Sequence, residues 1–157
     1  LRTGVAVGDE KVIRKMTIGK QAVDVHTSNL SQAIIDRYLR KNLLDDHLKE
    51  VIPVYREKKN TMYESMKKYM PTELVFTNPE GGLFIWGEFT NGLNVTDLFV
   101  EAVQATDTAY VSGKTFFASE DVDNTLRLNY SNASNEQIEN GIKKLGDFFK
   151  KKIAENK

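Results

Sequence analysis

The chain has 157 residues, and its 22 lysine and arginine residues balance its 22 aspartate and glutamate residues, so the formal net charge is zero. This balance argues against a nucleic-acid-binding surface, which would show as an excess of basic residues. The absence of cysteine excludes disulfides, thiolate metal sites and cysteine nucleophiles, and it favours a reducing, cytoplasmic location. No apolar run approaches the roughly 20 residues that a membrane-spanning helix needs, so no membrane partner is expected.

The first sixteen residues predict a short strand followed by a helix. Residues 1–8, "LRTGVAVG", have the character of a strand that ends at a glycine. Residues 9–16, "DEKVIRKM", begin with two acidic side chains, which favour a helix N-terminus. Because the sequence opens in mid-strand without an initiator methionine, we interpret Leu1 as a position within a longer protein.

Residues 27–70 are predicted to be mostly helical. Ser28 or Ser31 can cap the first helix. Pro53 cannot occupy a helix interior without consequence, so we expect it to kink the helix or to open a second one. The apolar residues that recur at helical spacing are Leu30, Ala33, Ile34, Tyr38, Val51, Tyr55, Met62, Met66 and Tyr69.

After Pro71 the pattern becomes that of strands. "ELVFTNP" and "GGLFIWGEF" predict two strands joined by a turn, in which we expect Gly81 or Gly82 to adopt a positive φ angle. "AYVSG" and "TLRLNYSN" predict two further strands, separated by a loop over 114–124.

Two more helices complete the predicted elements. "NVTDLFVEAVQAT" predicts a helix capped by Asn94 or Thr96. The last helix begins at Ser134, whose spacing to Gln137 is that of a capping box. Its expected buried stripe consists of Ile138, Ile142, Leu145 and Phe149. Together these elements predict the α+β class: a small, mainly antiparallel sheet with helices packed on it.

One residue of the last predicted strand is out of keeping with its neighbours. In "NTLRLNYSN", Arg127 lies on the polar face with no acidic residue beside it in sequence. It either points into water or binds an anion that the chain does not carry. Catalytic and metal-binding motifs are absent, and His26 and His47 are isolated residues that we interpret as surface side chains. Residue patterns alone therefore assign no catalytic residue and no metal ligand.

Several sequence blocks in a fixed order carry a resemblance to a known family. They are "LRTGVAVG", "SNLSQ", "DHLKEVIPVYREKKNTM", "NPEGGLFIW", "YVSGKTFF" and "NTLRLNYSN". Over essentially its whole length the chain resembles the C-terminal half of a fold-type I aminotransferase. These are the class I and II enzymes that use pyridoxal phosphate, and the 2-aminoadipate and aromatic branch is the most similar. Ser112 stands where the family usually has proline.

The resemblance implies roles for two arginines. Arg127 matches the family arginine that binds the α-carboxylate of the amino-acid substrate. Arg2 matches the arginine that binds the phosphate of pyridoxal phosphate. The family's catalytic lysine, which bonds the cofactor and moves the proton, would lie before Arg2. The resemblance therefore implies that this chain contains no catalytic residue and is inactive by itself.

The resemblance also implies a domain organisation. Residues 1–27 would complete the large cofactor-binding domain, and 28–157 would form the small domain, with a bridging helix over about 28–50. The intact protein would transfer an amino group from an amino acid to a 2-oxo acid. It would be a homodimer in which the small domain closes over the substrate against the upstream large domain.

Two other interpretations are compatible with the same residues. One is the effector domain of a transcription regulator that carries an aminotransferase-like module and a DNA-binding domain far upstream. The other is a binding or dimerisation module that has lost catalysis. A winged-helix segment upstream would indicate the regulator, whereas a natural start near Leu1 would indicate the freestanding module.

Overall fold

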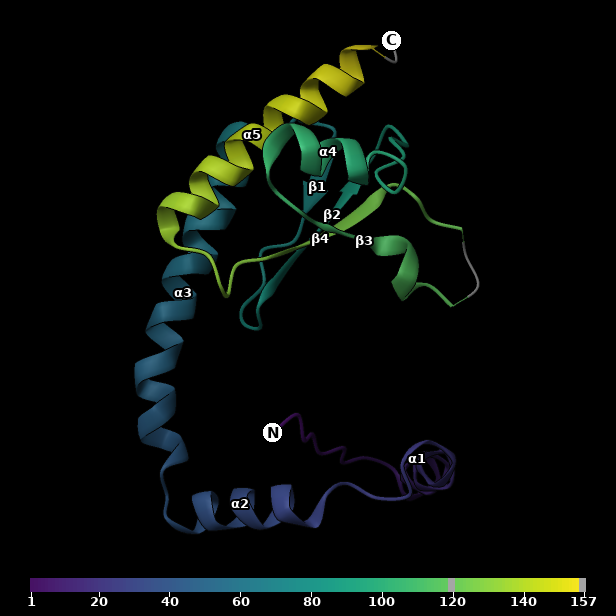
Figure 1. The fold of residues 1–157 in the computed structure, drawn as a ribbon, viewed down its shortest axis with the longest axis vertical. Helices are drawn as coiled ribbons and strands as arrows, with labels where there is room; N and C mark the ends of the chain where they lie inside the picture. The colour runs from purple at the N-terminus through teal and green to yellow at the C-terminus, as the bar shows by residue number, and fades with distance from the viewer. Residues whose placement is uncertain (119–120, 156–157) are drawn as a thin grey trace. The chain divides into compact units, whose positions relative to one another are not determined.

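The computed structural model describes residues 1–118 and 121–155 (Figure 1). The chain divides into two compact units, Leu1–Glu50 and Val51–Lys157. No helix in the described part of the chain is both long and apolar enough to cross a membrane. The predicted boundary at 27/28, between a cofactor-binding and a small domain, stays a prediction.

The first unit contains two helices that begin at capping side chains. Helix α1 spans Glu10–Val23, and the Asp9 carboxylate accepts a hydrogen bond from the Lys11 backbone N–H at 2.9 Å. Helix α2 spans Asn29–Arg40 and begins after Ser28, whose hydroxyl accepts from the Ser31 N–H at 3.5 Å. The helix predicted after Gly8 and the Ser28 cap are confirmed. No residue of either helix is buried, although α2 carries the predicted apolar spacing.

The strand predicted over residues 1–8 is wrong. These residues have no regular secondary structure, and the four strands of the described sheet all lie between Leu74 and Asn129. A strand exists only when a neighbour pairs with its backbone groups, and no described segment pairs with this one.

Helix α3 spans Leu44–Tyr69 and continues through Pro53. Of the two alternatives expected at Pro53, the opening of a second helix is wrong, because the helix that contains Pro53 begins at Leu44. The kink stays a prediction. A proline inside a helix lacks one backbone donor but leaves the bonds of the other turns in place. Met62, Ser65 and Met66 are the buried residues of α3, and they lie in its C-terminal half within the second unit.

The second unit is built on an antiparallel sheet with the strand order β1-β2-β4-β3. Its strands are β1 (Leu74–Phe76), β2 (Phe84–Phe89), β3 (Val111–Ser112) and β4 (Thr125–Asn129). The turn before β2 contains Gly82 at φ +86°, as predicted for one glycine of the pair. With its helices, this unit confirms the α+β class and the antiparallel pairing.

Shorter helices connect the sheet to the C-terminal helix. Helix α4 spans Phe99–Thr106, so it begins later than predicted. The Asn94 side chain accepts from the Asp97 N–H at 3.0 Å and caps only the turn before α4. The loop predicted over 114–124 opens with the 3-10 helix η1 (Gly113–Phe116), and part of that loop, residues 119–120, lies outside the described residues.

Helix α5 spans Asn135–Glu155 and begins with the predicted capping box. The Gln137 N–H donates to the Ser134 hydroxyl at 3.2 Å, while the Gln137 side chain accepts from the Ser134 N–H at 2.9 Å. All four residues of the predicted stripe are buried. The sequence pattern therefore located both the start and the buried face of this helix.

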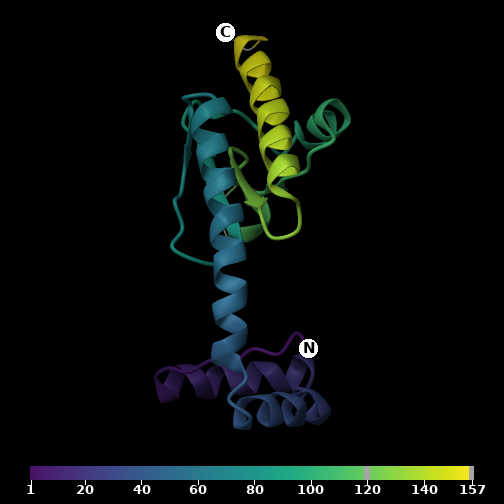
Figure 2. The same ribbon diagram turned by 90° about the vertical axis from the view of Figure 1, so that its left-hand side faces the viewer.

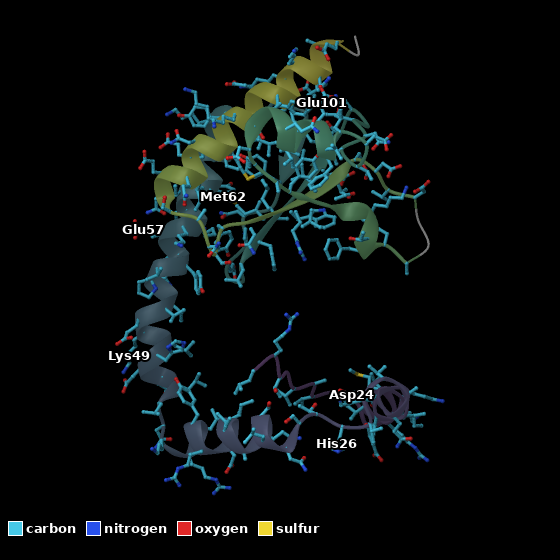
Figure 3. The ribbon with its side chains drawn as sticks, viewed as in Figure 1. Asp24, His26, Lys49, Glu57, Met62 and Glu101 are labelled. Atoms are coloured by element: carbon cyan, nitrogen blue, oxygen red, sulfur yellow. The ribbon has the colours of Figure 1, made fainter. Side chains whose placement is uncertain are left out.

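The core lies between one face of the sheet and the helices α3 and α5, which run side by side (Figure 2). Met62, labelled in Figure 3, contributes from α3 and is 4% exposed. Phe149 of α5 packs on Phe89 of β2 and on Tyr110, with ring centroids 4.9 and 5.8 Å apart. Because this core occupies one face of the sheet, the side chains of the other face remain available for a site.

Candidate functional site

Strand alternation places Arg127 on the sheet face opposite the core. Leu126 and Leu128, its neighbours in β4, are 0% and 2% exposed and point into the core. Arg127 pairs across the ladder with Trp86 of β2 and with Val111 of β3. Paired residues project to the same side of a sheet, so Trp86 and Arg127 share the face away from the core.

The Arg127 side chain has no polar partner within the described residues. It is half-buried, and its Nε is buried without a hydrogen-bond acceptor. Leaving a buried donor unsatisfied is unfavourable, typically by about 1–3 kcal/mol, so such a group points to a missing acceptor. The arrangement fits an anion supplied from outside the chain.

Lys114, a cation on the neighbouring η1, is in the opposite situation. Its ammonium lies 2.5 Å from an Asp121 oxygen and 3.1 Å from an Asp123 oxygen. Hydrogen bonds to Asp121 and then Asp123 raise the pKa of Lys114. Lys114 is therefore already matched by two carboxylates of the chain, whereas Arg127 is not.

Two aromatic rings flank the Arg127 guanidinium. Its central carbon lies 4.0 Å from the ring centroid of Phe84 and 4.5 Å from that of Phe116. Both distances are within the range of cation–π attraction. The residue patterns of the sequence did not predict these phenylalanines as part of the site. The available signal for Phe84 was its alternation with Ile85 in "GGLFIW", which places it on the same strand face as Trp86.

Ser112, which stands where the resemblance leads one to expect proline, forms hydrogen bonds at the start of η1. Its hydroxyl accepts from the Lys114 N–H at 3.3 Å and lies 2.6 Å from the Thr96 hydroxyl. A proline would offer no side-chain hydroxyl for either bond. The loop that carries Phe116 thus begins with polar contacts that a proline could not make.

Arg2 lies in the first unit, and it is exposed at a φ of 53°. A hollow of about 530 Å³ in the same unit is lined in part by Thr3, Gly4 and His26, but not by Arg2. Arg2 and Arg127 therefore belong to different units.

The remaining candidates from the sequence are at the surface. His26 and His47 are exposed, as predicted, and Figure 3 labels His26. The His26 Nδ1 is 3.0 Å from the Thr27 carbonyl oxygen. Among residues 1–118 and 121–155, no group of three or more histidine, aspartate or glutamate side chains is placed to hold a metal ion.

The sequence profile of the family described as "Aminotransferase class I and II" matches residues 1–145. The chain belongs to this family. It is 37% identical over 152 residues to aromatic-amino-acid aminotransferase 1 of Thermococcus litoralis. The aligned residues make up 97% of this chain and 36% of that protein. The aminotransferase membership stated as a resemblance from the sequence blocks is thereby confirmed.

Solved structures agree with this membership. The α-aminoadipate aminotransferase LysN of Thermus thermophilus, solved with N-(5′-phosphopyridoxyl)-L-leucine, superposes with a TM-score of 0.77 at 34% identity. The match covers 94% of this chain and 38% of LysN. The chain thus spans little more than a third of the length of these aminotransferases.

A regulator also matches the chain. The HTH-type transcriptional regulator NorG of Staphylococcus aureus is 25% identical over 151 residues, which is 96% of this chain and 34% of NorG.

Proposed function

We propose that this chain is the C-terminal portion of a pyridoxal-phosphate-dependent aminotransferase, and that Arg127 binds the α-carboxylate of the amino-acid substrate. The intact protein would transfer the amino group to a 2-oxo acid. The observation that carries the proposal is the half-buried Arg127 guanidinium, whose buried Nε has no acceptor within the described residues. A planar guanidinium donates two parallel hydrogen bonds to a carboxylate, a geometry that lysine cannot reproduce.

The same proposal gives Arg2 the cofactor phosphate. Its exposed guanidinium fits a phosphate group, which accepts hydrogen bonds from arginine in the same forked geometry. Pyridoxal phosphate, when bound, supplies the electron-accepting ring that amino-group transfer requires. Arg2 and Arg127 both donate hydrogen bonds and offer no acceptor, so they bind and orient their anions and do not take up the substrate proton.

Substitution of Arg127 in the intact protein tests the assignment. Arg127→Ala should lower kcat/KM for amino acids by about 30-fold to several thousand-fold, because truncating a buried charged partner typically costs 2–5 kcal/mol. Amines without a carboxylate should be much less affected. Arg56→Ala, which removes an exposed arginine of α3 in the same unit, is the matched control and should change neither activity. Equal losses with both substrate types would make Arg127 a structural residue.

We also propose that the 157-residue chain is inactive alone, since the family's catalytic lysine would precede Arg2. Mixed with pyridoxal phosphate, the purified chain should retain no one-to-one cofactor absorbance through gel filtration. Amino-group transfer should stay at the rate of free cofactor. Turnover above that rate would mean that a lysine within residues 1–157 performs the chemistry.

The proposed intact enzyme is a cytoplasmic homodimer. The lack of cysteine in this chain is in keeping with a reducing compartment, and the dimer rests on the family resemblance alone. Sedimentation of the intact protein measures the oligomeric state directly.

The similarity to NorG supports a second candidate, the effector domain of a transcription regulator. In that case the intact protein would bind pyridoxal phosphate and an amine as signals, and a winged-helix domain would precede the aminotransferase-like module. The sequence that precedes Leu1 in the intact protein separates the two candidates. Specific binding to an operator fragment, without amino-acid turnover, would favour the regulator.

A further inference from the structure

The two rings beside Arg127 reach it from the two sides of β4, one from strand β2 and the other from the 3-10 helix η1. Phe84 belongs to β2 and pairs with Asn129, so it lies diagonally across the ladder from Arg127. Phe116 ends η1, which directly follows β3 on the other side of β4. We call Phe84 and Phe116 the aromatic bracket.

The position of Phe116 is itself determined by close packing. Its ring meets the Trp86 ring edge-on, with centroids 5.8 Å apart at an angle of 75°. Gly113, at the start of η1, leaves no room for a Cβ, which would collide with the Thr125 hydroxyl and lie 2.7 Å from the Trp86 ring. The segment that carries Phe116 therefore approaches the sheet as closely as its backbone allows.

Hydrogen bonding through Nε does not orient the Arg127 guanidinium, because this buried atom has no acceptor within the described residues. The bracket is what touches it, at 4.0 and 4.5 Å from its central carbon. An arginine side chain has many rotamers, and immobilising it on ligand binding opposes that binding. Rings that already hold the guanidinium reduce this unfavourable term while leaving its hydrogen-bond donors free.

We propose that Phe84 and Phe116 are positioning residues, which hold the Arg127 guanidinium in the orientation that receives the substrate carboxylate. This inference rests on the proposed function of Arg127. It means that the affinity for a carboxylate depends on the cation–π contacts of Phe84 and Phe116 as well as on Arg127 itself. Phe116 lies in the loop that begins at Ser112, whose hydroxyl bonds to Thr96 and Lys114. The conformation of this loop therefore influences the affinity of Arg127 for a carboxylate.

The test uses the intact protein and a matched pair of probes, hexanoate and its neutral amide hexanamide, as inhibitors of amino-acid turnover. Phe116→Leu should raise the inhibition constant of hexanoate and the KM for the amino acid by about 3–30-fold, the range expected for a partly desolvated cation–π contact. The constant for hexanamide and kcat should change less than about two-fold. Phe116→Tyr, which keeps the ring, should restore hexanoate affinity.

Phe117→Leu is the matched control. Phe117 follows Phe116 in the chain, and the two side chains are 38% and 50% exposed, respectively. The Phe117 ring also packs on Trp86, with ring centroids 6.2 Å apart. In the described part of the chain its ring is not stacked on Arg127. This variant should leave hexanoate affinity unchanged. Equal weakening by Phe117→Leu and Phe116→Leu would reduce the effect to general packing and overturn the proposal.

A double-mutant cycle with Arg127→Met, which removes the positive charge, separates the two levels of inference. If the bracket acts through the guanidinium, Phe116→Leu should lose most of its effect on hexanoate in the Arg127→Met background. An undiminished effect in that background, or none in the wild-type background, would overturn the positioning role. If Arg127→Met itself leaves hexanoate affinity unchanged, it is the proposed carboxylate-binding function that fails.

Discussion

The two units of the chain have similar helical patterns but very different burial. Helices α1 and α2 of the first unit bury no residue, and Val12, Met16 and Ile18 of α1 are each more than half exposed. In the second unit, α5 alone buries seven residues. Apolar spacing therefore predicts which face of a helix is apolar, but it does not tell whether another element of the same chain covers that face.

The difference also separates the sources of stability. The helices of the first unit depend on caps and on exposed pairs such as Arg40 with Asp36 at 2.7 Å, which contribute only tenths of a kcal/mol each. The second unit adds burial of large side chains, which contributes about 1.5–3 kcal/mol for each one fully buried. Paired substitutions, one in each unit, test this contrast.

The largest difference is expected between Phe149→Ala and Ile18→Ala in the 157-residue chain. Phe149 is 0% exposed and contacts three other rings, whereas Ile18 is 54% exposed. Removing the Phe149 ring leaves a cavity and should lower the free energy of unfolding by about 3–5 kcal/mol. Ile18→Ala should stay within about 0.5 kcal/mol. Denaturant titration followed by Trp86 fluorescence and circular dichroism measures both.

A loss of several kcal/mol for Ile18→Ala would contradict the contrast, because it would mean that the apolar face of α1 is packed in this chain.

Two glycines provide a comparison in which the signs should be opposite. A Cβ at Gly146 of α5 would collide with the Tyr69 carbonyl, whose carbon would lie 2.9 Å away, whereas nothing lies within 4 Å at Gly19 of α1. Gly146→Ala should therefore destabilise the second unit by about 1–3 kcal/mol, since α3 and α5 must separate. Gly19→Ala should stabilise α1 by about 0.5–1 kcal/mol. Thermal unfolding followed by circular dichroism measures both changes.

If Gly146→Ala proved stabilising like Gly19→Ala, the close approach of α3 and α5 would be wrong.

The smallest contrast compares two tyrosine hydroxyls that donate to backbone carbonyls. The buried Tyr110 donates to the Val95 oxygen at 2.6 Å, and the half-buried Tyr38 of the first unit donates to the Leu43 oxygen at 3.1 Å. Tyr110→Phe should cost about 0.5–1.5 kcal/mol, because the Val95 oxygen loses its partner away from water. Tyr38→Phe should cost less, because water can replace the hydroxyl. Equal costs in denaturant titrations would contradict this order.

The same tyrosine predicts a pH dependence. Burial raises the pKa of Tyr110 above its usual value of 10.0, so the folded state favours the neutral hydroxyl. The contribution of the Tyr110 hydroxyl to the free energy of unfolding is fully present below about pH 10. It is lost as the pH rises further, because tyrosine then ionises readily in the unfolded chain but not in the folded one. Between pH 9 and about 11 the wild type should therefore lose more stability than Tyr110→Phe. If the stability of the two proteins changed with pH in the same way, burial of Tyr110 would not be the cause of the loss.

Much of the second unit could be predicted because its signals are local. The Ser134–Gln137 capping box, the α5 stripe and the positive φ at Gly82 each depend on residues a few positions apart. The alternation in "TLRLNYSN" likewise put Arg127 on the polar face, and its neighbours Leu126 and Leu128 are buried in the core on the opposite face. The α+β class follows from the sum of these elements.

The sequence by itself thus determined the capped starts of α2 and α5, the strand faces and the isolated arginine on one of them, because neighbours in the chain govern these features. Only the tertiary structure decided that residues 1–8 form no strand and that the α1 and α2 faces stay exposed, since pairing and burial need a partner elsewhere. It also decided that Phe84 and Phe116 meet at Arg127. That contact depends on the register of β2 against β4 and on the path of η1, and no local pattern encodes either.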